Sequence, residues 1–180
     1  KSDARIEVKK GDAMLFRKLL VCVFLLAILP SVASAEGSGP EIGKPSPNLI
    51  GRTMDDKPYR LKNDMGRAKV INFFWVGCKP CRQEMPELAQ LEKQYPGVKF
   101  IAVHTRSEKP EVVEKFVKSL SGAPSNIVLT SGGLEDIFHF IGLPHTIVLD
   151  SNNVVVASIS GYTPNNMQRL TTALQELTKQ

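Results

Sequence analysis

Two cysteines separated by two residues, Cys78 and Cys81, carry the clearest chemistry in this sequence. They lie where an apolar run ends and a helical pattern begins. A cysteine at a helix N-terminus faces unpaired backbone N–H groups and the positive end of the helix dipole, and both stabilise a thiolate. The neighbouring Lys79 adds a positive charge. We therefore expect the pKa of the Cys78 thiol to lie below its free value of about 8.5, which makes its thiolate a nucleophile.

The second cysteine lies about one helical turn further on. Cys81 is within reach of Cys78 and is more shielded by the helix itself. In a dithiol of this kind, the first cysteine attacks a substrate disulfide and the second resolves the mixed disulfide that results. The pair therefore predicts thiol–disulfide exchange with protein substrates, carried by a redox-active Cys78–Cys81 disulfide and no other cofactor.

Three other uses of the cysteine pair stay open. A structural disulfide that closes so small a loop would remove little entropy from the unfolded chain. A zinc site needs two more ligands, and the sequence has neither a second cysteine pair nor a histidine cluster. Copper(I) prefers thiolates, so a site formed by Cys78, Cys81 and a histidine such as His145 is the strongest of the three. A copper-binding chaperone for oxidase assembly is accordingly the alternative from another functional class.

The order of expected elements predicts a single α/β domain. A hairpin is expected within residues 48–63. Strands that alternate with helices pair in parallel through right-handed crossovers, whereas the last two strands, joined by a tight turn, must be antiparallel. The result is a mixed central sheet with helices on both faces and an N-terminal β-hairpin extension. Strand patterns fall at 69–76, 98–104, 126–130, 146–150 and 154–160, and helical patterns at 78–95, 110–120, 133–141 and from 164 onward.

The N-terminal region has the pattern of an export signal. Arg17 and Lys18 precede an uninterrupted apolar run over residues 19–29, and small residues at 33–35 suit a signal peptidase. A helix over that run would span only about 16 Å, less than the ~30 Å hydrocarbon core of a membrane. Cleavage after Ala35 is the preferred interpretation, and an uncleaved membrane anchor is the alternative.

The chain accordingly divides into four segments. Residues 1–13 lie upstream of the fold, 14–35 form the signal peptide or anchor, 36–47 form a Gly-, Pro- and Ser-rich linker, and 48–180 form the folded domain. We expect this domain to be a monomer in the periplasm or another extracytoplasmic compartment, soluble after cleavage.

Composition supports a folded globule and excludes several other classes. Hydrophobic residues make up 42% and charged residues 23% of the 180 residues. Residues 1–35 hold six of the 23 basic and three of the 18 acidic residues, which leaves 17 and 15, a net charge of +2, for residues 36–180. The remaining basic residues are scattered among acidic ones, so nucleic acid is not an expected partner.

The string CKPCRQEMPEL at 78–88 resembles the active-site segment of the TlpA/ResA/CcmG group of thioredoxin-like proteins. The likeness includes GKPSP at 43–47 and GLPHTIVLD at 142–150, and it extends over about residues 44–178. It implies a thioredoxin fold and an exported thiol–disulfide oxidoreductase that reduces disulfides in cytochrome c maturation or in metallochaperones. Electrons would then come from a membrane thiol donor of the DsbD/CcdA type. A dithiol oxidase or isomerase stays open, because the direction of transfer depends on the reduction potential.

The resemblance also implies roles for residues outside the cysteine pair. Pro144 matches the cis-proline that faces the disulfide in thioredoxin folds, and the backbone at Leu143 would then bind an extended substrate segment beside Cys78. The alternative is an ordinary proline that opens a strand. Glu84 matches an acidic residue close to the cysteines, where burial would raise its pKa and let it exchange protons with Cys81. The alternative is a solvated carboxylate on the helix.

Some residues depart from the pattern of the thioredoxin-like group. Gly77 stands where thioredoxins have a tryptophan, and the only tryptophan lies two residues earlier, so we expect a more open surface around Cys78. Asn72 replaces the buried aspartate that assists thioredoxin, which leaves Glu84 as the proton acceptor. Sco-type copper proteins have three residues between their cysteines, one more than this chain. We expect His145 to face the core rather than the site.

Overall fold

The computed structural model describes residues 38–179. The expected upstream segment, the signal region and the first two residues of the expected linker lie outside these described residues. The elements are β1 (Ile50–Thr53), β2 (Pro58–Arg60), η1 (Leu61–Asn63), β3 (Lys69–Phe74), α2 (Lys79–Gln94), β4 (Lys99–His104), α3 (Pro110–Lys118), β5 (Asn126–Leu129), α4 (Leu134–Phe138), β6 (His145–Leu149), β7 (Val155–Ser160) and α5 (Pro164–Thr178).

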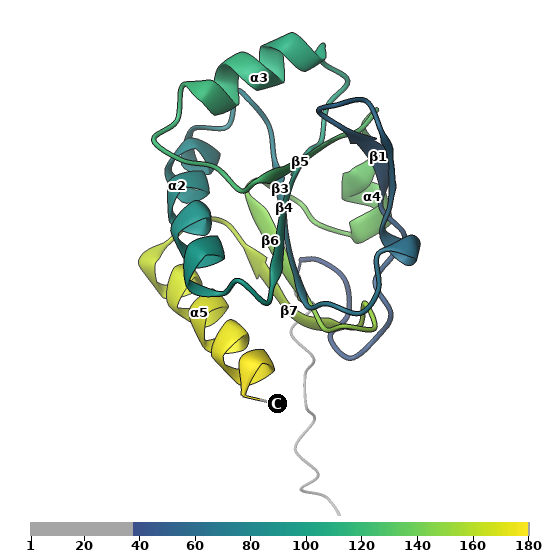
Figure 1. The fold of residues 1–180 in the computed structure, drawn as a ribbon, viewed down its shortest axis with the longest axis vertical. Coiled ribbons are helices and arrows are strands. Elements are labelled where there is room, and N and C mark those ends of the chain that lie inside the picture. The colour runs from purple at the N-terminus through teal and green to yellow at the C-terminus, as the bar shows by residue number, and fades with distance from the viewer. Residues whose placement is uncertain (1–37, 180) are drawn as a thin grey trace, which may run out of the picture. The chain divides into compact units, whose positions relative to one another are not determined.

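The strands form one seven-stranded sheet in the order β2-β1-β5-β4-β3-β6-β7 (Figure 1). β3 pairs in parallel with β4, and β4 pairs in parallel with β5. β6 is antiparallel to β3, and β7 is antiparallel to β6. The N-terminal hairpin β1–β2 joins the sheet through an antiparallel pairing of β1 with β5. The predicted mixed sheet, with a hairpin at each end of the domain, is confirmed.

The central strand β3 is buried along its whole length, which explains its continuous apolar sequence. Because successive side chains of a strand point to opposite faces, its residues divide into two sets. Ile71 and Phe73 join a core cluster with Phe138 of α4. Val70 and Phe74 belong to clusters on the α2 side. Asn72 has the same parity as this second set, so it faces α2.

Helices cover both faces of the sheet (Figure 1). α2, α3 and α5 pack on one face. α4 packs on the other face, together with Leu49 and Leu61 at the two ends of the β1–β2 hairpin. Full burial of a leucine stabilises a fold by roughly 1.5–3 kcal/mol, so the interface with α2 and α5 holds the first face firmly. The leucines that are at most 8% exposed there are Leu88, Leu91, Leu170 and Leu174.

The described part of the expected linker, residues 38–47, is bonded to the domain. Backbone hydrogen bonds join residues 43–46 to residues 153–155 at the start of β7. Nearer the N-terminus, the N–H of Gly39 donates to the carbonyl of His139 at 2.8 Å. This segment therefore contacts the loop that leads into β6.

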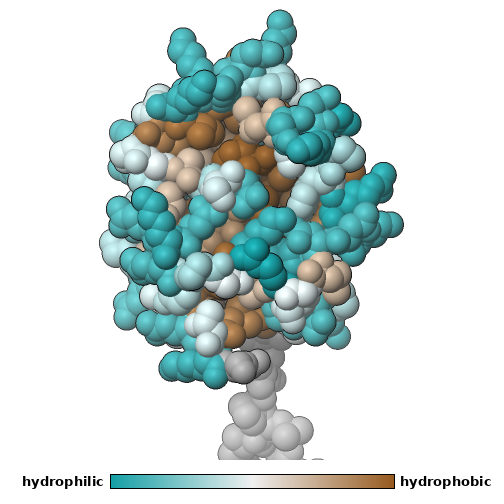
Figure 2. Space-filling view, viewed as in Figure 1, coloured by the Kyte–Doolittle hydropathy of each residue, from teal (hydrophilic) through white to brown (hydrophobic). Residues whose placement is uncertain are grey.

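The surface of the domain is mostly hydrophilic on the face seen in Figure 2, and hydrophobic residues show between the polar ones in its upper part. Across residues 38–179, the structure contains no helix with both the length and the apolar character needed to cross a membrane.

Candidate active site

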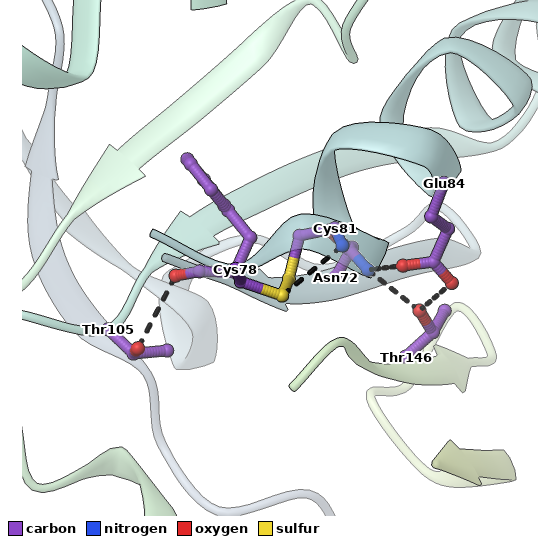
Figure 3. Close-up of a disulfide and its surroundings, with 7 residues drawn as sticks. Asn72, Cys78, Cys81, Glu84, Thr105 and Thr146 are labelled. Atoms are coloured by element: carbon purple, nitrogen blue, oxygen red, sulfur yellow. Dashed lines mark hydrogen bonds between the residues drawn. A yellow bond between two sulfur atoms is a disulfide. The ribbon is translucent and has the colours of Figure 1, made fainter. Parts of the chain in front are cut away.

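Cys78 and Cys81 form a disulfide where the chain leaves β3 and enters α2 (Figure 3). Cys78 is the N-cap residue of α2, and its Sγ accepts a hydrogen bond from the N–H of Cys81 at 3.2 Å. Cys81 is fully buried, whereas Cys78 is partly exposed. Cys78 is therefore the more accessible of the two, and the expected position of the pair at the helix N-terminus is confirmed.

Local sequence explains why the helix begins here. Pro80 lies in the first turn, where its fixed φ suits a helix and its missing N–H removes no helical hydrogen bond. The N–H of Cys78 donates to the carbonyl of Trp75 at 3.0 Å, which closes a tight turn after the strand. The hydroxyl and the N–H of Thr105 both donate to the carbonyl of Phe74, the last residue of β3.

Glu84 lies inside the protein, three residues after Cys81 on α2, and is only 3% exposed. Its Oε2 accepts a hydrogen bond from Nδ2 of Asn72 at 2.7 Å, and its Oε1 accepts one from Oγ1 of Thr146 at 3.2 Å. Figure 3 shows these three side chains gathered on one side of the disulfide. Of the two interpretations of Glu84, the buried carboxyl group is therefore correct and the solvated carboxylate is wrong.

The environment of Glu84 sets its protonation near neutral pH. Burial raises the pKa of Glu84 to about 7, because a charged carboxylate loses its hydration there. The hydrogen bonds from Asn72 and Thr146 favour the charged form and oppose the shift. A carboxyl group with a pKa close to 7 exists in both states at neutral pH, so it can accept and donate a proton.

Register in the sheet explains how Thr146 enters this cluster. Thr146 of β6 is the antiparallel partner of Asn72 of β3, so both side chains lie on the face that α2 covers. Nδ2 of Asn72 also donates to Oγ1 of Thr146 at 2.9 Å. Thr146 was not among the site residues expected from the sequence. The available signal was its position, since Thr146 is a hydroxyl residue two positions after the expected cis-proline, next to the apolar residues 147–149.

The peptide bond between Leu143 and Pro144 is cis, as the resemblance implied. Pro144 is buried, and its carbonyl accepts a hydrogen bond from the N–H of Gly161 at 2.8 Å. Leu143 is partly buried and packs against the same cluster as Cys78 and Cys81. The loop before β6 is thus brought to the cysteine pair from more than 60 residues away in the sequence.

His145 is fully buried, so the expectation of a core residue is confirmed. It pairs with Phe73 across the sheet and stacks on Phe140, on the face opposite to Glu84. Its two ring nitrogens each lie 3.0 Å from a serine hydroxyl, those of Ser158 and Ser160. Burial lowers the pKa of His145 to about 4, so the ring is neutral at pH 7.

This position of His145 bears on the copper interpretation. A copper(I) site of the kind left open by the sequence would use His145 together with Cys78 and Cys81. The ring nitrogens of His145 are directed at the hydroxyls of Ser158 and Ser160 instead. Within the described part of the chain, no three His, Cys, Asp or Glu side chains are grouped so that they could share a metal ion.

The ring of Trp75 contributes to the surface beside Gly77, where the sequence predicts an open site. The ring of Trp75 lies over Gly77, so closely that a Cβ atom on this glycine would be 2.6 Å from Cζ3 of the ring. A side chain at position 77 would therefore collide with the ring of Trp75. Gly77 and Trp75 are both exposed and Cys78 is partly exposed, so the more open surface around Cys78 stays a prediction.

Comparison with known proteins agrees with this geometry. The family model described as Redoxin matches residues 41–174. The chain belongs to the Redoxin family. Thiol-disulfide oxidoreductase ResA of Bacillus thuringiensis subsp. konkukian is 28% identical over 157 residues, which cover 84% of this chain and 90% of that protein. ResA of Geobacillus kaustophilus is 26% identical over 159 residues, 86% of this chain and 91% of its own length.

Solved structures show the same fold as this Redoxin-family protein. The thioredoxin domain of a thiol-disulfide oxidoreductase from Bacteroides vulgatus has a TM-score of 0.63 at 21% identity, with 73% of this chain and 96% of that one covered. A thiol:disulfide interchange protein of Chlorobium tepidum has a TM-score of 0.59 at 25% identity, with 74% and 98% covered. The expected thioredoxin-like fold is confirmed, and so is the class of enzyme, a thiol–disulfide oxidoreductase of the ResA type.

Proposed function

We propose that this protein is an exported oxidoreductase that reduces disulfides of extracytoplasmic proteins through its Cys78–Cys81 dithiol. The observation that carries the proposal is the asymmetry of the pair. Cys78 is partly exposed at the N-terminus of α2, and Cys81 is fully buried. A nucleophile must be reachable by the substrate, whereas a resolving thiol needs to reach only its neighbour.

In the proposed cycle, the Cys78 thiolate attacks one sulfur of a substrate disulfide. A bond forms between Cys78 and the substrate, and the other substrate sulfur leaves as a thiolate that takes up a proton. Cys81 loses its proton and attacks the sulfur of Cys78, which forms the intramolecular disulfide and releases the second substrate thiol. Two electrons pass to the substrate, and the protein ends oxidised.

Glu84 is proposed to take the proton from Cys81 in the second step. It follows Cys81 by three residues, which places both on one side of the helix. It is buried, and its pKa of about 7 suits proton exchange with a thiol at neutral pH. Asn72 cannot act as a base, so its part is to hold the carboxyl group by the 2.7 Å hydrogen bond.

The loop before β6 is proposed to bind the substrate polypeptide. Leu143 contacts the hydrophobic cluster that includes both cysteines, and Pro144 follows in a cis conformation. An extended substrate segment would lie along the backbone at Leu143, with its cysteine at Cys78. The assignment of Leu143 and Pro144 as substrate-binding residues comes from the resemblance to the thioredoxin-like group. The contact of Leu143 with the cluster that includes the cysteines supports it.

Residues 14–35 support an extracytoplasmic location, because they combine basic residues, an apolar run and small residues in the order of an export signal. In that location the oxidised protein must be reduced again, so we propose a membrane thiol donor of the DsbD/CcdA type as its partner. Cytochrome c maturation or a metallochaperone would supply the substrates, and the protein would act as a monomer.

Cysteine variants test the mechanism. Cys78→Ser is expected to abolish reduction of insulin by dithiothreitol through the protein, whereas Cys81→Ser is expected to accumulate a mixed disulfide that mass spectrometry detects. Turnover retained in Cys78→Ser would overturn the assignment of the nucleophile. The reduction potential of the Cys78–Cys81 couple then separates a reductant from an oxidase or isomerase, since about 30 mV corresponds to about 1.4 kcal/mol for this two-electron couple.

A further inference from the structure

The single tryptophan of the chain stands beside the active-site cysteines. Trp75 lies in the turn between β3 and α2, three residues before Cys78. It is 37% exposed although its ring covers Gly77. A large aromatic side chain that keeps this much surface in contact with water, next to a partly exposed cysteine, offers an apolar contact to whatever approaches that cysteine.

A carboxylate from another part of the chain fixes the ring. Glu108 lies in the loop between β4 and α3, and its Oε1 accepts a hydrogen bond from the indole N–H of Trp75 at 3.1 Å. The indole has no other polar group, so this bond sets the orientation of the ring. The second carboxylate oxygen, Oε2, lies 3.0 Å from Nε2 of His104 at the end of β4. Glu108 thus bridges Trp75 and His104.

His104 is a fully buried ionisable residue that takes no part in the proposed cycle. Its Nδ1 lies 3.0 Å from the carbonyl oxygen of Arg106, which can only accept, so Nδ1 carries a hydrogen. Its Nε2 lies 3.0 Å from Oε2 of Glu108. Both atoms are buried, and among residues 38–179 no hydrogen-bond partner competes for either of them.

A close polar contact joins the buried ends of the two side chains. Burial lowers the pKa of His104, and the charge of the facing Glu108 opposes that effect. Without the carboxylate, the buried Nε2 would have no polar neighbour, and without the imidazole, the buried side of the carboxylate would have none. The pair is therefore a fixed support behind the exposed ring.

We propose that Trp75 is a substrate-binding residue of this oxidoreductase, and that Glu108 and His104 are positioning residues that hold its ring at Cys78. The ligand is the polypeptide that carries the disulfide, through an apolar side chain next to its cysteine. A small disulfide reagent reaches the sulfur of Cys78 without this contact. The inference rests on the proposed function, because it concerns the protein substrate of the same dithiol.

Substrate size is the first test. The pre-reduced full chain is mixed with insulin or with the small disulfide 5,5′-dithiobis(2-nitrobenzoate), and the second-order rate constants are compared. Trp75→Ala and Glu108→Ala are each expected to lower the rate with insulin about tenfold, the equivalent of about 1.4 kcal/mol, and to leave the rate with the small reagent within about twofold. Ile42→Ala, at a residue that is 61% exposed on the N-terminal segment, is the matched control and should alter neither rate.

Tryptophan fluorescence is the second test, because the chain has one tryptophan and the emission reports only on Trp75. Glu108→Ala is expected to shift the emission maximum of the folded protein toward that of a freely solvated indole. Glu108→Gln should keep the wild-type spectrum, since its carbonyl can accept from the indole and its amide can donate to a neutral His104. Glu111→Ala, at an exposed glutamate in the first turn of α3, is the control and should leave the spectrum unchanged.

The outcomes separate this inference from the proposed function. If the wild-type protein reduces the small reagent and not insulin, or neither, the proposed reduction of protein disulfides fails. If the wild type reduces insulin and the Trp75→Ala variant does so equally well, the binding role of Trp75 is overturned. If Glu108→Ala leaves the emission unchanged, or Glu108→Gln shifts it as far as Glu108→Ala does, the positioning role of Glu108 is overturned.

Discussion

Asn72 of β3 and Glu84 of α2 are joined by a hydrogen bond of 2.7 Å, in which the amide donates to the carboxyl oxygen behind the disulfide (Figure 3). The bond crosses the interface between the central strand and the helix that carries both cysteines. It holds an ionisable group where water does not hydrate it, so the pKa of Glu84 rises to about 7. The free energy of unfolding and the rate at which the mixed disulfide is resolved should both depend on this group.

Glu84 is expected to make the folded state less stable as pH rises. The folded pKa of about 7 lies above the ordinary value of 4.5, so the folded state holds the proton more tightly than the unfolded state. The stability is complete below pH 4.5, falls between pH 4.5 and 7, and is constant above that range as far as this group is concerned. The change amounts to about 3 kcal/mol at roughly 1.4 kcal/mol per pH unit. In Glu84→Gln this decrease should disappear, as measured by urea unfolding of the oxidised protein.

The control for this measurement is Glu111→Gln, because Glu111 is exposed and lies away from the cluster. It should show the same pH dependence as the wild type. A wild-type stability that does not fall between pH 4.5 and 8 by more than in Glu84→Gln would contradict the burial of an ionisable carboxyl group.

The second step of the reaction should also depend on Glu84. A positioned general base contributes about 100-fold or more to a proton transfer, so Glu84→Gln is expected to slow resolution of the mixed disulfide by about that factor. In the wild type, the rate of this step should rise with pH around 7, and the variant should lack that transition. Rapid acid quenching followed by mass spectrometry measures the lifetime of the mixed disulfide. A variant with wild-type lifetimes at every pH would remove Glu84 from the mechanism.

Asn72→Asp is expected to destabilise the protein most strongly at high pH. The new carboxyl group would face Glu84 at hydrogen-bond distance, and two buried carboxylates this close cannot both be ionised at low cost. At pH 5 the two groups can share a proton and the loss should be small, whereas at pH 8 it should reach about 3 kcal/mol. Urea unfolding at both pH values gives the comparison. Asn165→Asp, at an exposed position of α5, should stay within about 0.5 kcal/mol of wild type at each pH.

Gly39 is expected to be intolerant of a side chain. Its φ is +116°, and an added Cβ atom would overlap the Ser158 hydroxyl and lie 2.6 Å from Nε2 of His145. Gly43 is the matched control, because its φ is +81° but a Cβ atom there would meet nothing within 4 Å. Gly43→Ala should cost about 1 kcal/mol from backbone strain alone, and Gly39→Ala should cost at least about 1 kcal/mol more. Equal losses in urea unfolding would show that the N-terminal segment does not pack on His145.

Much of this protein follows from its sequence. The apolar run at 69–76 predicted the central strand, and the CxxC that follows predicted a dithiol at a helix N-terminus. These features are local, because strand and helix periodicity and the chemistry of neighbouring cysteines are written in consecutive residues. The observed β3 ends at Phe74, two residues before the predicted end, because the chain turns at Trp75 to bring Cys78 to the helix.

Tertiary structure decided what surrounds the cysteines. Thr146 reaches Glu84 only because β6 pairs with β3 in one register, and a shift by one residue would have placed His145 there instead. Glu108 reaches both Trp75 and His104 through a loop whose path no local pattern specifies. The burial that raises the pKa of Glu84 likewise depends on groups far apart in the chain. The sequence predicts which atoms react, because the cysteine pair is local, whereas the burial of Glu84 and the surroundings of Cys78 depend on the packing of distant segments.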